Sequence, residues 1–195
     1  MERVSSLFLF IIPLAFCFAT TFAVHTTGGL SAQHSAKPTA GAEALIKQAC
    51  QKALYKEFCV STLKARPEAK NIDLKGLAFL TMKVAKEQGN ATAAFIDTKL
   101  KNEESLAPGL DQALNDCREQ YDDALAQIED SMQAFLANAA NDVNTWLSAA
   151  MTNADTCEEG LNDAGVGGAM GDRNQVFVKL CSNALAVTNA WAQRH

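Results

Sequence analysis

The feature that most constrains the fold is a stretch from Leu110 to Leu161 in which apolar residues recur at helical period on both sides of a polar break. After the break, at 138–142, the same three- and four-residue spacing continues. Such spacing places apolar side chains on one face of each helix. The stretch therefore predicts two antiparallel helices packed along one seam, whose members are Leu110, Leu114, Cys117, Tyr121, Leu125, Ile128, Met132 and Phe135, then Val143, Leu147, Ala150, Ala154, Cys157 and Leu161.

Each of these predicted helices carries a cysteine on the seam, Cys117 in the first and Cys157 in the second. The two positions are equidistant from residue 137, at the edge of the predicted turn. Residues placed in this way lie at about the same height in an antiparallel pair, so a Cys117–Cys157 disulfide is geometrically feasible.

Three further cysteines are Cys50, Cys59 and Cys181. The sixth, Cys17, lies in an N-terminal segment that is interpreted below as a cleaved secretory signal, so it is left out of the pairing. Five cysteines can form two disulfides and one free thiol in fifteen ways. The local spacing favours Cys50–Cys59 and the helical seam favours the pair described above. Cys181 then remains, and we expect it to be a buried thiol that packs like a small apolar residue.

The N-terminal residues 1–23 have the pattern of a secretory signal. Arg3 supplies the positive end, residues 7–18 the apolar core, and Thr21-Phe22-Ala23 a cleavage site. This apolar run is short for a membrane span, and no other run of 18 apolar residues exists. We therefore expect a secreted protein without a membrane segment after cleavage. Residues 24–41 are expected to form a flexible arm.

Two more helical regions precede the seam. Residues 42–66 predict a short helical hairpin that ends before Pro67. Residues 73–102 predict a long helix capped by Asp73, with Gly89 as a weak point of about 1 kcal/mol and Asn90 in a glycosylation sequon near its outer face. The stripe expected to face the core consists of Leu74, Leu77, Thr81, Val84, Gln88, Ala91, Phe95 and Thr98.

The last predicted helix follows a flexible, glycine-rich connection at 162–171. Asp172 and Gln175 resemble a capping box at its start. Its apolar residues again recur at helical period. The sequence thus predicts an all-α domain over 42–195: an antiparallel four-helix bundle at 73–195, with the disulfide-clipped hairpin of 42–66 as an N-terminal extension. The residues expected on the core face of the last helix are Phe177, Leu180, Ala184, Val187 and Trp191.

Residues for catalysis or metal binding are scarce. His25, His34 and His195 lie at the ends, so a nucleophile in the bundle has no histidine base, and the cysteine spacings are not those of zinc sites. The net charge of -5, without a basic cluster, argues against nucleic acid. We expect no catalytic residue, cofactor or metal, and interpret the carboxylates as solvated helix faces rather than a glycosidase pair: Asp116, Glu119, Asp122, Asp123, Asp155, Glu158 and Glu159.

Several motifs resemble those of the plant invertase and pectin methylesterase inhibitor family. The Cys50–Cys59 spacing matches the hairpin of that family, and Leu180-Cys-Ser-Asn-Ala-Leu-Ala186 includes its unpaired fifth cysteine. The resemblance covers nearly the whole chain after the signal. Its other motifs are Asp73-Leu-Lys-Gly-Leu77, Asp116-Cys-Arg-Glu-Gln-Tyr-Asp-Asp-Ala-Leu125 and Asp142-Val-Asn-Thr-Trp-Leu-Ser-Ala-Ala-Met-Thr-Asn-Ala-Asp-Thr-Cys-Glu-Glu-Gly160.

The resemblance also separates two target classes. Invertase inhibitors of the family tend to carry Pro-Lys-Phe just before the long helix that follows the polar break, where this chain reads Ala140-Asn141-Asp142. The sequence from Asp142 to Trp146 and the following Leu-Ser-Ala-Ala are similar to the pectin methylesterase branch. The resemblance therefore implies an inhibitor of pectin methylesterase. Two alternatives stay open: an inhibitor of cell-wall or vacuolar acid invertase, and a secreted receptor-binding bundle without inhibitory activity.

The mechanism implied by the resemblance is steric. Such an inhibitor, a monomer before it binds, covers the pectin-binding cleft of its enzyme in a one-to-one complex in the cell wall. The family's contact threonine precedes the fourth paired cysteine, which here makes it Thr156. Asp155, Glu158 and Glu159 surround it and are expected to share the contact.

Overall fold

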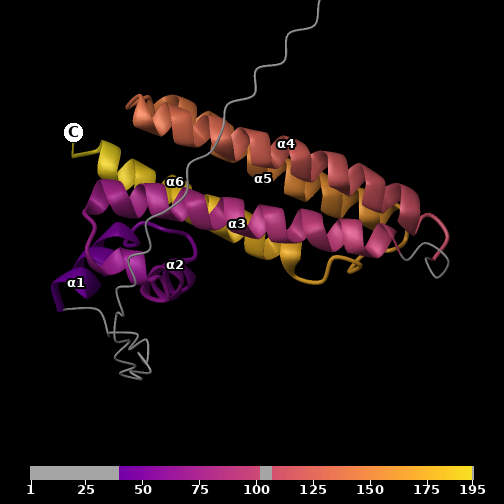
Figure 1. Ribbon diagram of the computed structural model, residues 1–195, viewed down its shortest axis with the longest axis horizontal. Coiled ribbons are helices and arrows are strands. Elements are labelled where there is room, and N and C mark those ends of the chain that lie inside the picture. Colours follow the sequence, from indigo (N-terminus) through magenta and orange to yellow (C-terminus); the bar gives the residue numbers. More distant parts are fainter. Residues whose placement is uncertain (1–39, 102–106, 195) are drawn as a thin grey trace, which may run out of the picture. The chain divides into compact units, whose positions relative to one another are not determined.

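The structure, a computed structural model, describes residues 40–101 and 107–194 (Figure 1). These residues contain six α-helices and a short 3-10 helix, without a β-strand among them, which confirms the all-α prediction. The elements are α1 Ala40–Ala49, α2 Lys56–Lys64, η1 Pro67–Lys70, α3 Leu74–Leu100, α4 Leu110–Leu136, α5 Ala140–Asp163 and α6 Arg173–Ala192.

The predicted signal at 1–23 lies outside the described residues, as do His25, His34 and His195. Residues 24–39 of the predicted arm also lie outside the described residues. Ala40 and Gly41, which we had placed in the arm, form the first turn of α1.

Helices α3 to α6 form the predicted antiparallel four-helix bundle (Figure 1). Successive helices run in opposite directions, and each packs along two neighbours: α4 lies between α3 and α5, and α6 lies between α5 and α3. Short connections favour this arrangement because a helix that must return at once packs against its predecessor. The apolar faces of all four helices meet in one continuous core.

The seam predicted for the α4–α5 hairpin is confirmed. All six expected residues of α5 are buried, and Val143, Leu147 and Leu161 are fully so. In α4 five of the eight expected residues are buried, while Leu110, Leu125 and Met132 pack at the edge of the core. The turn is shorter than predicted, because α5 already begins at Ala140.

The second half of the predicted stripe on α3 is wrong. Ala91 and Thr98 are exposed, and the buried face instead passes through Gly89, Thr92 and Ile96. Gly89 has no side chain, so Leu125 and Phe177 of the neighbouring helices can lie close against this face. The hydroxyl of Thr92 donates to the Gln88 carbonyl oxygen at 2.9 Å, so its burial leaves no unbonded donor.

The start of α3 and the start of α6 differ in their capping. The side chain of Asp73 accepts a hydrogen bond from the Gly76 amide at 2.8 Å, as predicted. The capping box predicted at Asp172 and Gln175 is wrong, because the Asp172 side chain makes no capping bond. Its backbone, at φ -95° and ψ 4°, is not in the extended conformation that an N-cap normally adopts.

The connection between α5 and α6 is anchored to the bundle. Gly165 adopts a left-handed φ of 71°, which lets the Val166 amide donate back to the Leu161 carbonyl oxygen at 2.9 Å. Met170 is fully buried. This glycine-rich segment, which we had expected to be flexible, is therefore held by a helix cap and by a core residue.

The N-terminal hairpin packs on α3 and α6. A Cys50–Cys59 disulfide joins its two arms, and Ile46, Ala49 and Leu63 are buried. Neither α1 nor α2 is long enough to be stable alone. The disulfide and the docked apolar side chains together hold the hairpin in place.

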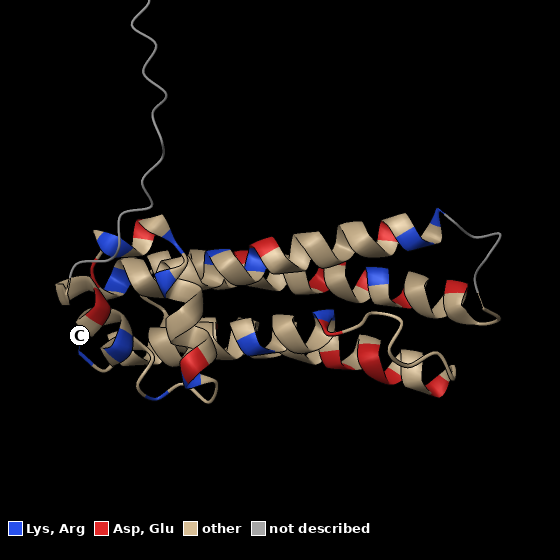
Figure 2. Ribbon diagram, turned by 90° about the horizontal axis from the view of Figure 1, so that it is seen from below, with Lys and Arg blue, Asp and Glu red and all other residues tan. Residues whose placement is uncertain are grey.

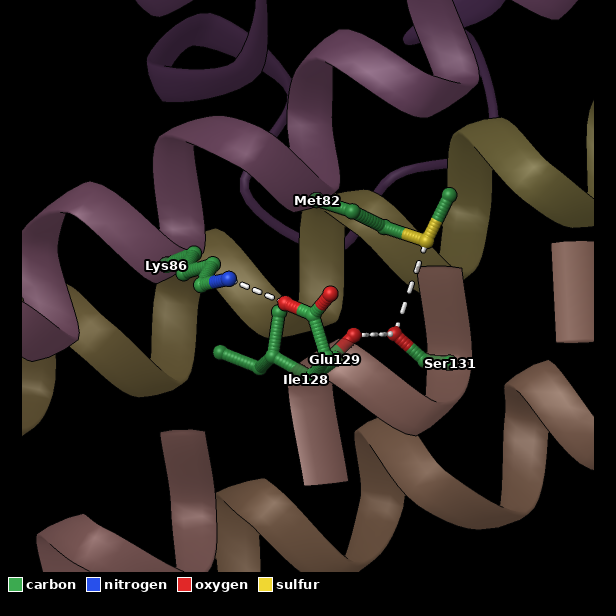
Figure 3. A network of polar contacts seen from close by, with 5 residues as sticks. All are labelled: Met82, Lys86, Ile128, Glu129 and Ser131. Carbon is green, nitrogen blue, oxygen red and sulfur yellow. Dashed lines mark hydrogen bonds and ion pairs between the residues drawn. The ribbon is translucent and has the colours of Figure 1, made fainter. Parts of the chain in front are cut away.

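A polar network fixes one edge of the α3–α4 interface (Figure 3). The buried Ser131 hydroxyl donates to the Ile128 carbonyl oxygen at 2.7 Å and faces the Met82 sulfur. Next to it, Lys86 of α3 pairs with Glu129 of α4. The hydrogen bond and charge of Lys86 lower the pKa of Glu129 from its ordinary value. These contacts join α3 and α4 both in the core, at Ser131 and Met82, and nearer the surface, at Lys86 and Glu129.

Candidate functional site

The outer face of α5 carries the residues singled out by the sequence. Thr156 precedes the buried Cys157 by one position, which turns it about 100° away from the core. Thr156, Asp155 and Glu159 are exposed, whereas Glu158 is partly buried. The structure thus brings the four predicted contact residues together but separates Glu158 from the others by its environment.

A disulfide fixes this part of α5. Cys157 is bonded to Cys117 of α4, one of the two pairs that the sequence favoured, and the two Cα atoms lie 4.6 Å apart. The bond holds α5 against α4 at the level of Thr156. The backbone beneath the contact residues is therefore rigid.

The hydroxyl group of Thr156 is already used as a donor. Its Oγ1 donates to the carbonyl oxygen of Thr152 at 2.9 Å. A hydroxyl has one hydrogen to donate, so Thr156 presents only acceptor lone pairs to solvent. The carboxylates of Asp155 and Glu159 are acceptors as well. This face therefore suits a partner that brings N–H or O–H donors.

Glu158 is held by contacts that the sequence analysis missed. Its Oε2 accepts a hydrogen bond from Asn174 Nδ2 at 2.7 Å. Asn174, in the first turn of α6, is only 3% exposed, and its Oδ1 accepts from the Tyr121 hydroxyl at 2.8 Å. Burial raises the pKa of Tyr121 above its ordinary value, so the phenol stays a donor. Tyr121 and Asn174 thus orient Glu158 from inside the bundle.

Acidic residues are concentrated on the hairpin that bears this face. Helices α4 and α5 together hold twelve Asp and Glu but a single basic residue, Arg118. Arg118 is itself paired with Asp97 at 2.8 Å and with Asp122 at 2.5 Å. In Figure 2 more of the red segments lie in the half of the bundle away from the label C than in the half beside it. The face therefore combines acceptor groups with a negative potential.

The arrangement offers little for catalysis. Of the seven candidate carboxylates, all but Glu158 are exposed. Within the described ranges, no group of three His, Cys, Asp or Glu side chains could hold a metal ion. In the same part of the chain, no helix is both long and apolar enough to cross a bilayer.

Two further predicted residues lie elsewhere. Cys181 is fully buried and unpaired, and burial raises the pKa of its thiol. Asn90 is exposed on α3, so its glycosylation stays a prediction. Treatment with a peptide N-glycosidase and a mass measurement would test it.

Comparisons with known proteins agree on one family. The family model described as "Plant invertase/pectin methylesterase inhibitor" matches residues 44–187. The "Putative invertase inhibitor" of Platanus orientalis is 32% identical over 133 residues, which are 68% of this chain and 77% of that protein. "Pectinesterase inhibitor 2" of Arabidopsis thaliana is 28% identical over 163 residues, covering 84% of this chain and 88% of the relative.

A solved structure shares the fold. The crystal structure of a mutant form of a pectin methylesterase inhibitor from Arabidopsis aligns with a TM-score of 0.59 at 22% sequence identity. The alignment covers 72% of this chain and 92% of that one. It supports the helical architecture described above.

Proposed function

Since the chain belongs to the plant invertase/pectin methylesterase inhibitor family, we propose that it inhibits a plant pectin methylesterase by forming a one-to-one complex. The family consists of inhibitor proteins, so the chain is not an enzyme. It acts by occupying the pectin-binding cleft of the target and excluding the polysaccharide.

The observation that carries this proposal is the state of Thr156. It is exposed, it lies beside the Cys117–Cys157 disulfide, and it presents acceptor groups together with Asp155 and Glu159. A rigid face loses little conformational entropy on binding, which favours a tight complex. Because the side chain of Thr156 is short, an enzyme surface can approach the helix closely at this position.

The choice of pectin methylesterase rests on the first turn of α5. That turn reads Ala140-Asn141-Asp142, without the Pro-Lys-Phe that the family's invertase inhibitors tend to carry. The similarity to "Pectinesterase inhibitor 2", which extends over 88% of that protein, agrees with this choice. Acid invertase is the second candidate, because a relative at 32% identity is named for invertase.

One experiment separates the candidates. The purified protein is mixed at equal dose with a pectin methylesterase and with an acid invertase, and methanol and glucose release are measured. We expect loss of methanol release with little effect on glucose release. Potent inhibition of invertase alone would reverse the choice, and no inhibition of either enzyme would favour the receptor-binding alternative.

We further propose that the protein is secreted to the cell wall and is a monomer until it binds. The predicted signal at 1–23 and the two disulfides suit an oxidising compartment. N-terminal sequencing of protein from wall extracts should begin within a residue or two of residue 24. Size-exclusion chromatography with light scattering should give the mass of one chain.

A further inference from the structure

A small pocket opens between α5 and α6, next to the candidate contact face. Its volume is about 260 Å³. Three segments far apart in the sequence build it, since it takes one residue from before α2, two from α5 and the others from α6. The residues that matter for its chemistry are Tyr55, Asp155, Glu158, Asn174, Val178 and Lys179.

One side of the pocket consists of acceptors. Asp155 and Glu158 are three positions apart on α5, so their side chains lie on the same side of the helix. Glu158 uses one oxygen to accept from the buried Asn174 at 2.7 Å. Among the described residues, neither carboxylate takes part in an ion pair. Two carboxylates that form no ion pair therefore line the pocket, and Lys179 is the cation that lines it with them.

The remaining wall is mixed: Gln175 and Lys179 are polar or charged, while Tyr55 and Val178 supply aromatic and aliphatic surface. Val178 and Tyr55 offer contact surface for a hydrocarbon stem. The ammonium nitrogen of Lys179 lies 5.6 Å from the centroid of the Tyr55 ring. That distance is typical of a cation–π contact, so this ring already attracts one positive group.

We propose that this pocket receives an arginine side chain of the inhibited enzyme. A guanidinium is planar and carries five donors, which suits two carboxylates on one side and an aromatic ring on the other. Its three-carbon stem would lie on Val178. This inference rests on the proposed function, in which the neighbouring α5 face meets the enzyme.

Asn174 acts here as a positioning residue. It touches no part of the partner but holds the Glu158 carboxylate in one orientation through Nδ2, while its Oδ1 is fixed by Tyr121. A pre-oriented carboxylate need not be ordered when the guanidinium arrives. Lys179, by contrast, repels the incoming cation.

Inhibition constants for charge variants test the pocket. Asp155→Asn and Glu158→Gln should each weaken inhibition of a pectin methylesterase by about tenfold or more, as expected when one member of a desolvated charge pair is lost. Lys179→Met should strengthen it by about threefold, since a repulsive charge is removed. Asp130→Asn, which removes an exposed charge from α4, is the matched control and should inhibit like the parent. Melting temperatures of all variants exclude misfolding.

A second measurement does not depend on inhibition. The side-chain amide resonances of Asn174 are followed by NMR while Nα-acetyl-arginine amide is added. They should shift and saturate in the parent protein but not in Asp155→Asn/Glu158→Gln. An equal response to the matching lysine amide would overturn the assignment to a guanidinium.

The two measurements separate failure of the pocket from failure of the proposed function. If the parent inhibits and the charge variants inhibit equally well, the pocket is not a contact. If the amide resonances shift but no pectin methylesterase is inhibited, the pocket stands and the enzyme target is wrong. Unshifted resonances overturn the pocket whatever the inhibition shows.

Discussion

Gly89 of α3 lies so close to Leu125 of α4 that a β-carbon at residue 89 would stand 2.9 Å from Leu125 Cδ2. The same β-carbon would stand 3.0 Å from Cε2 of Phe177 in α6. Three helices of the bundle thus converge on one glycine. The residue that helix propensity marks as a weak point is the residue that lets these helices meet.

Replacing Gly89 by alanine should therefore destabilise the protein. Propensity alone would favour alanine by about 1 kcal/mol, but overpacking a core costs typically 1–3 kcal/mol, so we expect a net loss of up to about 2 kcal/mol. Gly160→Ala is the matched control, because that helical glycine has nothing within 4 Å of the new β-carbon. It should be stabilising by roughly 0.5–1 kcal/mol. Urea denaturation of both variants measures the difference, and equal signs would contradict the packing argument.

A substitution on the contact face should change inhibition without changing the stability of the fold. Thr156→Trp should weaken inhibition strongly while changing the free energy of unfolding by no more than about 0.5 kcal/mol, as is usual for surface positions. Thr145→Trp is its control. Thr145 lies about three turns before Thr156 on α5, is also exposed, and likewise donates its hydroxyl to the carbonyl oxygen four residues earlier. An inhibition assay and a thermal melt are run together. If both variants inhibit alike, the contact lies elsewhere; if Thr156→Trp unfolds, Thr156 is a packing residue.

The opposite behaviour is expected for Leu125, which packs at the core edge against Gly89. Leu125→Asp would place a charge there without a partner and should unfold the bundle. Inhibition should then be lost together with the helical circular dichroism signal. Retained helicity would show that α4 can shift to expose this position.

Alkaline pH should destabilise the fold through Cys181. Burial raises the pKa of this thiol above the ordinary 9.0, so the unfolded chain releases the proton first. The stabilising contribution is complete below pH 9 and is lost as the pH rises, by about 1.4 kcal/mol per unit. Urea midpoints between pH 8 and 10.5 should fall less steeply for Cys181→Ala than for the parent. Cys181 should also react with a thiol reagent only after unfolding; rapid reaction of native protein would contradict its burial.

The two disulfides should differ in what they contribute. Cys117–Cys157 spans 40 residues and Cys50–Cys59 spans 9, which in the chain-entropy model stabilise by roughly 4 and 2.5–3 kcal/mol. The paired alanine variants should follow this order in urea denaturation. Peptide mapping without reduction should show both links, and a Cys117–Cys181 link would overturn the helix order.

Sequence periodicity located the core face of α5 because the residues at its three- and four-residue spacing are apolar and most of those between them are polar. It failed in the second half of α3, where Gly89, Ala91, Thr92 and Ala93 give little contrast between faces. Burial in that segment depends on the shape of the neighbouring helices. The packing of the neighbouring helices, which the local sequence does not contain, buries Thr92 and leaves Ala91 exposed.

The contact face and the pocket also differ in how far the sequence could predict them. The exposure of Thr156 follows from the periodicity, since its neighbour Cys157 lies on the seam. Its role as a contact came only from a family resemblance. Asn174 carried no signal, because a buried asparagine looks like any polar residue at a helix start. Its position depends on α6 docking beside α5, and that of Tyr55 depends on how the hairpin packs.

The separation of charge within the domain has a kinetic consequence. Against the twelve acids and one base of α4 and α5, the other described residues carry seven acids and fourteen bases. A molecule with such a dipole rotates in the field of a charged partner before the two collide, so that its acidic α4–α5 side arrives first. Added salt shortens the reach of this field. Ionic strength should therefore set how often an encounter is productive, while the lifetime of the complex stays nearly the same.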